Sequence, residues 1–189
     1  MILFFDTETT GKYNFKEPPQ AAHQPRLVQL AAILTDDAGK ELSYVNLVVK
    51  PDGFTIPAEA SEIHGITTER ANEVGVECSV VRDIFRSFWK ASNLIVGHNI
   101  EFDLHIMDVE LFRAAGGFKT WGEPRNTVCT MHNMTEVCKL PGKFGSYKWP
   151  KLQEAYKHAF GIEFDTPHDA MADIRACAKI YFGLLAQPK

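Results

Sequence analysis

The sequence has few of the features that mark secreted, membrane-bound or zinc-thiolate proteins. Its 189 residues contain four cysteines, at positions 78, 129, 138 and 177, and none of them forms a Cys-x-x-Cys pair. This spacing indicates neither a zinc site nor a disulfide framework, so it favours a reducing compartment such as the cytoplasm. The apolar run at residues 1–5 is too short for a signal peptide or a membrane span, and we expect no membrane association.

The sequence also lacks an excess of basic residues, internal repeats and low-complexity tracts. The formal net charge of -4 argues against indiscriminate polyanion binding by the whole surface. A hydrophobic content of 45% and a charged content of 23% are ordinary for a globular protein. We therefore expect residues 1–189 to form a single domain with a full core.

Hydrophobic patterning predicts an α/β protein. Turn residues and apolar periodicity divide the chain into short buried strands and amphipathic helices. The first three strands are expected to form a meander, and alternating helices and strands follow, which is typical of a mixed sheet flanked by helices. The predicted strands are 1–5, 27–34, 42–49, 94–96 and 126–131, and the predicted helices are 59–63, 80–92, 100–114, 151–160 and 170–185.

Two acidic residues directly follow the first apolar run. Asp6 and Glu8 lie two residues apart, so on a strand their side chains point to the same side. Adjacent carboxylates repel each other, and a bound divalent cation removes that repulsion. Oxygen-only ligands favour magnesium or manganese. The alternative is a solvated loop with two acidic residues.

Two later segments offer further carboxylates at the starts of helices. Asp103 is expected in the first turn of the helix that follows strand 94–96, where the helix dipole also favours a negative charge. His168 is expected just before the last helix and Asp173 within its first turns, with Asp169 as the helix cap. A surface histidine beside a cap is the alternative interpretation of His168.

Taken together, these segments resemble the DnaQ-like 3′-to-5′ exonucleases of the histidine-type DEDD group. The matching motifs occur in the family order, as Phe-Asp-Thr-Glu-Thr-Thr-Gly at 5–11, Gly-His-Asn at 97–99 with Phe-Asp at 102–103, and a histidine five residues before the aspartate at 168–173. Ile-His-Gly-Ile-Thr at 63–67 also resembles a family segment. The resemblance implies a ribonuclease H-like fold with a five-stranded mixed sheet that carries the site at one edge.

The resemblance also implies roles for individual residues. Two divalent ions, Mg²⁺ or Mn²⁺, would be held by Asp6, Glu8, Asp103 and Asp173, with His168 as the general base and nucleoside 5′-monophosphates as products. The implied substrate-binding residues are Thr7, Thr9, Thr10, Ile63, His64 and Phe102. For Ile63 and Phe102 the alternative is ordinary core packing, and Asn99 is expected to cap its helix.

The sequence alone leaves two interpretations for each of two segments. Residues 139–157 contain five lysines interleaved with Phe144, Tyr147 and Trp149 and a single acid, Glu154. This composition suits a single-strand binding groove, and the alternative is a solvated surface whose aromatic residues anchor to the core. The loop at 12–25 is either a substrate lid or a docking surface.

Three functions therefore compete. The expected activity is a DNA-directed exonuclease on single-stranded or frayed 3′ ends, which either stands alone or serves a DNA polymerase. An RNA-directed relative is the first alternative, since the 2′-hydroxyl decides between them and no residue settles the choice. An inactive module that binds nucleic acid or a polymerase is the second alternative.

Overall fold

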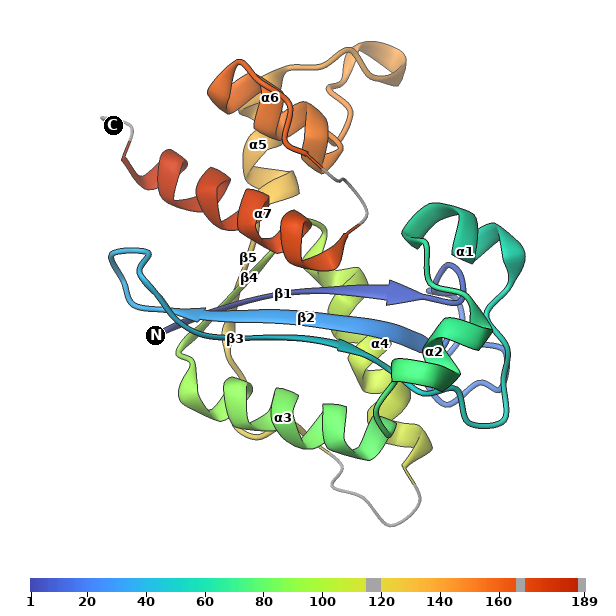
Figure 1. Cartoon of the computed structure of the whole chain (residues 1–189). Coiled ribbons are helices and arrows are strands. Elements are labelled where there is room, and N and C mark those ends of the chain that lie inside the picture. The colour runs from blue at the N-terminus through green and yellow to red at the C-terminus, as the bar shows by residue number, and fades with distance from the viewer. Residues whose placement is uncertain (115–119, 166–168, 187–189) are drawn as a thin grey trace.

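The computed structural model describes residues 1–114, 120–165 and 169–186. The described residues form one sheet of five strands in the order β3-β2-β1-β4-β5, with helices on both faces (Figure 1). β1 pairs antiparallel with β2 and parallel with β4, which confirms the predicted α/β mixed sheet. The strands are β1 (Ile2–Thr9), β2 (Leu27–Thr35), β3 (Glu41–Val48), β4 (Leu94–Gly97) and β5 (Asn126–Cys129).

Helices cover the two faces of the sheet unequally. α3 and α4 pack under one face, and α7 crosses the other face with α5 and α6 beyond it (Figure 1). The helices of the described residues are α1 (Ala58–His64), α2 (Thr68–Val74), α3 (Cys78–Ala91), α4 (Ile100–Arg113), α5 (Thr130–Cys138), α6 (Leu152–Phe160) and α7 (Ala170–Leu185), with a 3-10 turn η1 (Lys143–Gly145). No described helix is long and apolar enough to cross a membrane.

β1 is the central strand, and its alternation separates the two faces. Phe5 packs edge-on against Phe85 of α3, whereas Phe4 contacts Tyr181 and Phe182 of α7. Because side chains alternate along a strand, Asp6 lies on the same face as Phe4. The strand continues past the apolar run to Thr9, because β2 pairs with it along its whole length. The acidic pair therefore lies within the strand, on the α7 face.

The structure corrects the end of the fifth predicted strand and adds two helices. The fifth strand ends at Cys129 instead of residue 131, because β4 offers partners only as far as Gly97, which pairs with Cys129. The helix α5 follows at once and was not predicted; its buried residues Thr130, Met134 and Cys138 recur every four positions. The sequence analysis also missed α2, a helix of seven residues whose N-cap Thr67 accepts a hydrogen bond from the Arg70 N–H.

The loop at 12–25 is fastened to α4 along its length. Tyr13 is buried, and its ring stacks on that of His105 at 4.7 Å. The Gln24 side chain bonds to both the N–H and the carbonyl of Asn14. The Arg113 guanidinium donates to the carbonyls of residues 21, 22 and 24. These bonds favour a fixed wall over a freely moving lid.

Candidate metal-dependent active site

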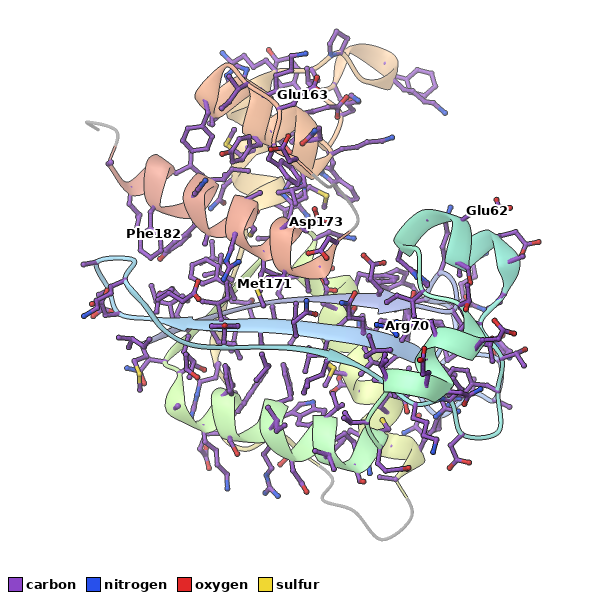
Figure 2. The ribbon with its side chains drawn as sticks, viewed as in Figure 1. Glu62, Arg70, Glu163, Met171, Asp173 and Phe182 are labelled. Atoms are coloured by element: carbon purple, nitrogen blue, oxygen red, sulfur yellow. The ribbon has the colours of Figure 1, made fainter. Side chains whose placement is uncertain are left out.

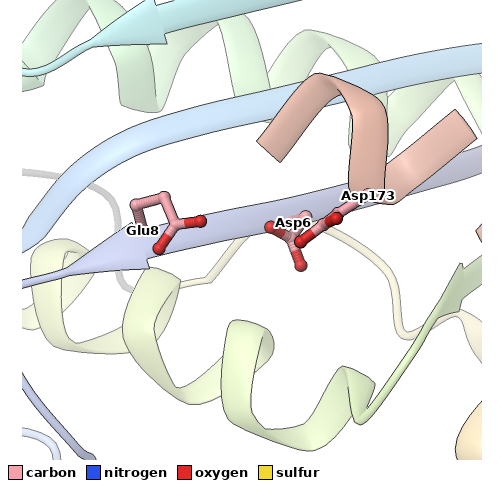
Figure 3. A group of neighbouring side chains, drawn as sticks. All are labelled: Asp6, Glu8 and Asp173. Atoms are coloured by element: carbon pink, nitrogen blue, oxygen red, sulfur yellow. The ribbon is translucent and has the colours of Figure 1, made fainter. Parts of the chain in front are cut away.

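Three carboxylates from two distant parts of the chain meet above the centre of the sheet. Among the described residues, Asp6, Glu8 and Asp173 each offer an oxygen atom, and these oxygens lie within 4.8 Å of one another. Figure 3 shows the carboxylates of Asp6 and Asp173 side by side, with Glu8 further along β1. The predicted convergence of the first and third motifs is therefore present in the fold.

The start of α7 positions Asp173 over β1. Asp169 is the N-cap, as predicted, because its side chain accepts a hydrogen bond from the Ala172 N–H at 2.9 Å. Ala170 and Met171 are buried against β2, and Asp173 follows in the first turn. Asp173 and Phe182 lie toward opposite ends of α7 (Figure 2). Phe182 packs on Phe4, so contacts with β2 at one end and with β1 at the other fix the helix.

Asp103 approaches the cluster from α4. It lies in the first turn of that helix, as predicted, and it is 3% exposed. Its Oδ1 accepts hydrogen bonds from the Thr7 N–H at 2.9 Å and from the Thr7 hydroxyl at 2.7 Å. Asp103 is thus fastened to the strand residue between Asp6 and Glu8. Asn99 occupies the N-cap position, but its side chain makes no capping bond, so that prediction was wrong.

The crowded acids alter one another's protonation. Burial, followed by the charges of Asp103 and Glu8, raises the pKa of Asp6 well above its ordinary value. Burial and the charge of Asp173 raise the pKa of Glu8 to about 8. Burial also raises the pKa of Asp103 to about 7, although the Thr7 hydrogen bonds oppose this shift. These shifts all disfavour the ionised carboxylates when no cation is bound. A divalent cation offsets their repulsion, and an all-oxygen donor set suits magnesium or manganese.

A cavity of about 370 Å³ adjoins Glu8, between the end of β1, α1 and the start of α4. All six predicted substrate-binding residues line it: Thr7, Thr9, Thr10, Ile63, His64 and Phe102. Ile63 is 60% exposed, which excludes the core-packing alternative for that residue. Phe102 is partly buried against the main core and also reaches the cavity.

Hydrogen bonds fix the walls of this cavity. The Thr9 hydroxyl donates to the Gly11 carbonyl, and the Thr10 hydroxyl accepts from the Arg26 N–H. His64 Nδ1 accepts from the Ile66 N–H at 3.1 Å, which places the proton on Nε2. Burial lowers the pKa of His64, and a hydrogen bond with the Thr9 backbone opposes this shift.

Some predicted residues are not tested, and others were missed. His168 lies outside the described residues, and its role stays a prediction. Lys12 and Glu59 also line the cavity although the sequence analysis did not select them. The position of Lys12 directly after the first motif was the available signal. Asp169, which we expected only as a cap, also adds to the negative field that raises the pKa of Glu8.

Residues 143–149 of the segment at 139–157 lie at the surface, whereas Ala155 and Tyr156 of α6 are buried in a core cluster. Phe144 is fully exposed, and Trp149 is 64% exposed. The alternative in which these aromatics anchor the segment to the core is therefore wrong for both residues. Two of the five lysines are engaged in ion pairs, Lys148 with Glu154 at 2.6 Å and Lys157 with Glu163 at 2.8 Å.

The five-stranded mixed sheet with helices on both faces has the ribonuclease H-like fold. Comparison with known families makes this more specific, because residues 3–181 match the RNase_T family, described as exonuclease. The chain belongs to this exonuclease family, and the resemblance to DnaQ-like exonucleases is confirmed.

Individual relatives agree with this assignment. An uncharacterized exonuclease, CP81, of Escherichia phage 186 is 30% identical over 183 residues, covering 92% of this chain and 82% of the relative. The DNA polymerase III subunit epsilon of Buchnera aphidicola is 32% identical over 109 residues, covering 58% of this chain and 44% of the relative.

Solved structures share the fold. E. coli exonuclease I in complex with a dT13 oligonucleotide superposes with a TM-score of 0.76 at 24% identity over 97% of this chain. Exonuclease I from Methylocaldum szegediense superposes with a TM-score of 0.75 at 26% identity over 100% of this chain. The chain spans only 40% and 41% of those two proteins.

Proposed function

We propose that this chain is a metal-dependent 3′-to-5′ exonuclease that acts on single-stranded or frayed 3′ ends of DNA and releases nucleoside 5′-monophosphates. The observation that carries the proposal is the meeting of Asp6, Glu8 and Asp173 within 4.8 Å, beside a cavity with the predicted substrate residues. A nucleotide-sized cavity next to a cation site suits the removal of one terminal nucleotide at a time.

Each residue then has a definite task. Asp6, Glu8, Asp103 and Asp173 would hold two Mg²⁺ or Mn²⁺ ions, which when bound activate a water molecule and stabilise the leaving oxygen. Thr7 is a positioning residue, because its hydrogen bonds orient Asp103. His168 would take the proton of the attacking water. Ile63, His64 and Phe102 would line the site of the terminal bases.

Two relatives support DNA as the substrate and a polymerase as a partner. E. coli exonuclease I was solved with a dT13 oligonucleotide, and another relative is named DNA polymerase III subunit epsilon. We extend both properties to this chain as part of the proposal. The chain is then either a free-standing nuclease or the proofreading component of a polymerase.

The test compares four labelled substrates: single-stranded DNA, mismatched duplex DNA, the same DNA with a blocked 3′ end, and RNA. We expect stepwise shortening from the 3′ end of DNA, with nucleoside 5′-monophosphates released, that stops in EDTA and resumes with Mg²⁺ or Mn²⁺. Faster RNA cleavage would establish the RNA-directed alternative, and no cleavage with any metal would establish the inactive module.

A variant links the activity to the site. Asp173→Asn should abolish cleavage because the cluster loses one charged ligand, while the fold survives. Asp83→Asn, at an exposed position on α3 under the opposite face of the sheet, is the matched control and should keep wild-type activity. Metal-dependent cleavage by Asp173→Asn at the wild-type rate would refute the assignment.

A further inference from the structure

The segment between α5 and α6 forms a closed hairpin that carries aromatic and basic side chains into solvent. Its arms are joined by the Lys148 N–H to the Leu140 carbonyl at 3.0 Å and by the Gly142 N–H to the Ser146 carbonyl at 2.8 Å. A Cβ on Gly142 would lie 2.7 Å from that carbonyl oxygen, so the turn requires glycine there. We call residues 139–151 the basic-aromatic hairpin; it lies on the α7 side of the sheet (Figure 1).

The aromatic residues of this hairpin contribute little to the fold. Phe144 at the tip is fully exposed and has φ of 55°, a left-handed conformation that costs a bulky side chain roughly 1–2 kcal/mol. Tyr147 and Trp149 are 41% and 64% exposed. Phe144 thus stands fully in solvent on a strained backbone, and Tyr147 and Trp149 are partly exposed, with the Trp149 ring 5.3 Å from that of His132.

The charges of the hairpin point to a polyanion. Within the part of the chain that the structure describes, Lys139, Lys143 and Lys151 form no ion pair, whereas Lys148 is bound to Glu154. Glu154 also accepts a hydrogen bond from the Lys151 N–H at 2.8 Å, so it ties the base of the hairpin to the start of α6. Three lysines that form no ion pair among the described residues therefore share the segment with the exposed rings, on a protein whose formal net charge is -4.

The base of the hairpin is bonded to the residue that follows β4. β4 lies next to β1 and runs parallel to it, with Phe4 opposite Val96, and His98 follows the end of β4. His98 Nε2 donates to the Pro150 carbonyl at 2.9 Å, and Nδ1 lies 3.0 Å from the Thr130 hydroxyl. Burial lowers the pKa of His98, which suits this neutral bridging role. Trp149 therefore directly precedes a residue that is bonded to the end of β4, the strand next to the one that carries Asp6 and Glu8.

We propose that the basic-aromatic hairpin binds the single-stranded part of the substrate, upstream of the nucleotides in the cavity, by stacking bases on Phe144 and Trp149 and pairing phosphates with Lys139 and Lys143. This inference rests on the proposed exonuclease function. Stacking on an exposed ring accepts any base, and ammonium groups recognise the backbone, so the contact is independent of sequence. A hydrophobic protein partner is the competing occupant, but it would leave the lysines without counter-charges.

The experiment compares a long substrate with a minimal one. The chain with Mn²⁺ or Mg²⁺ is given a single-stranded dT20 oligonucleotide or the p-nitrophenyl ester of thymidine 5′-monophosphate, which reaches only the active site. Phe144→Ala and Trp149→Ala should each lower the ratio of kcat/KM for dT20 to kcat/KM for the ester by roughly 5-fold or more. Tyr44→Ala, an exposed aromatic on β3, is the control and should keep the wild-type ratio.

Salt dependence provides an independent measurement. Replacing both Lys139 and Lys143 with alanine should reduce the slope of log(kcat/KM) for dT20 against log[salt] by about 1.4, since each single-strand phosphate contact contributes about 0.7. The control pair Lys40→Ala and Lys90→Ala, both exposed, should leave the slope unchanged.

The outcomes separate this inference from the function on which it rests. If the wild-type protein cleaves neither substrate with any metal, the proposed function fails. If it cleaves both and the hairpin variants keep the wild-type ratio and salt slope, the hairpin inference alone is overturned. In that case a protein partner becomes the better occupant of the surface.

Discussion

Replacing Glu8 with glutamine should make the metal-free protein more stable while removing its metal response. The pKa of Glu8 rises from 4.5 to about 8 in the folded chain because of burial and the charge of Asp173. The folded protein therefore binds more protons than the unfolded chain between these pH values, and its stability falls as the pH rises through this window. At full ionisation the shift corresponds to about 5 kcal/mol, at about 1.36 kcal/mol per pKa unit.

The measurable effect should be smaller. Glu8 is not fully buried, and water that enters the open cavity screens its charge, so we expect about 2 kcal/mol. Glutamine has nearly the same shape and no charge. In EDTA at pH 8, Glu8→Gln should therefore raise Tm by about 4–8 °C. At pH 5 the gain should fall below about 1 kcal/mol, because most of the wild-type Glu8 is then protonated in the folded state.

The assay is thermal unfolding at pH 5 and pH 8, with EDTA or with excess Mg²⁺, followed by circular dichroism. Ions that bind only the folded state raise its stability. Mg²⁺ should raise the Tm of the wild-type protein at pH 8 and should have little effect on Glu8→Gln. Glu62→Gln, at an exposed position on α1, is the matched control. A lower Tm for Glu8→Gln at pH 8 in EDTA, or a wild-type Tm independent of pH in EDTA, would refute the reasoning.

Two further predictions concern a buried ion pair and the base. Glu110 binds Arg26 through both carboxylate oxygens and also accepts a hydrogen bond from the Leu27 N–H. Glu110→Ala should therefore lower the free energy of unfolding, measured in urea, by about 3 kcal/mol. Glu73→Ala, which removes the exposed ion pair with Arg70, should lower it by less than about 1 kcal/mol. His168→Ala should slow single-turnover cleavage by about 10²-fold or more and leave oligonucleotide affinity nearly unchanged. An unchanged single-turnover rate would remove His168 from the role of general base.

Local patterns were sufficient for most elements of the fold. The double burial of β1, its alternation and the cap at Asp169 all depend on neighbouring residues, and the structure confirms them. The short helices α2 and α5 were missed because their local patterns are weak or ambiguous. α2 has a side-chain cap but little apolar periodicity. α5 begins inside a segment that was predicted as a strand, and only the end of the pairing with β4 at Cys129 separates the two elements.

The sequence predicted which residue types form the site, because the motifs occur in the order typical of the family, but it did not predict how these residues are arranged in space. Asp6 and Asp173 are 167 positions apart, and only the crossing of α7 over β1 brings them together. The bonds from Thr7 to Asp103 join β1 to α4 in the same way. The sequence also did not show which lysines of the basic-aromatic hairpin are free to bind a ligand. Lys148 pairs with Glu154 only because the chain turns into α6 at this point.

The sequence by itself determined which side chains share a face, because the periods of strands and helices are set by the backbone of each segment. It thereby determined the α/β class, the acidic pair of β1 and the family. Only the tertiary structure decided which faces meet, how deeply the acids are buried and which aromatic rings stay in solvent. These properties depend on contacts between segments far apart along the chain, whose distances no local pattern encodes.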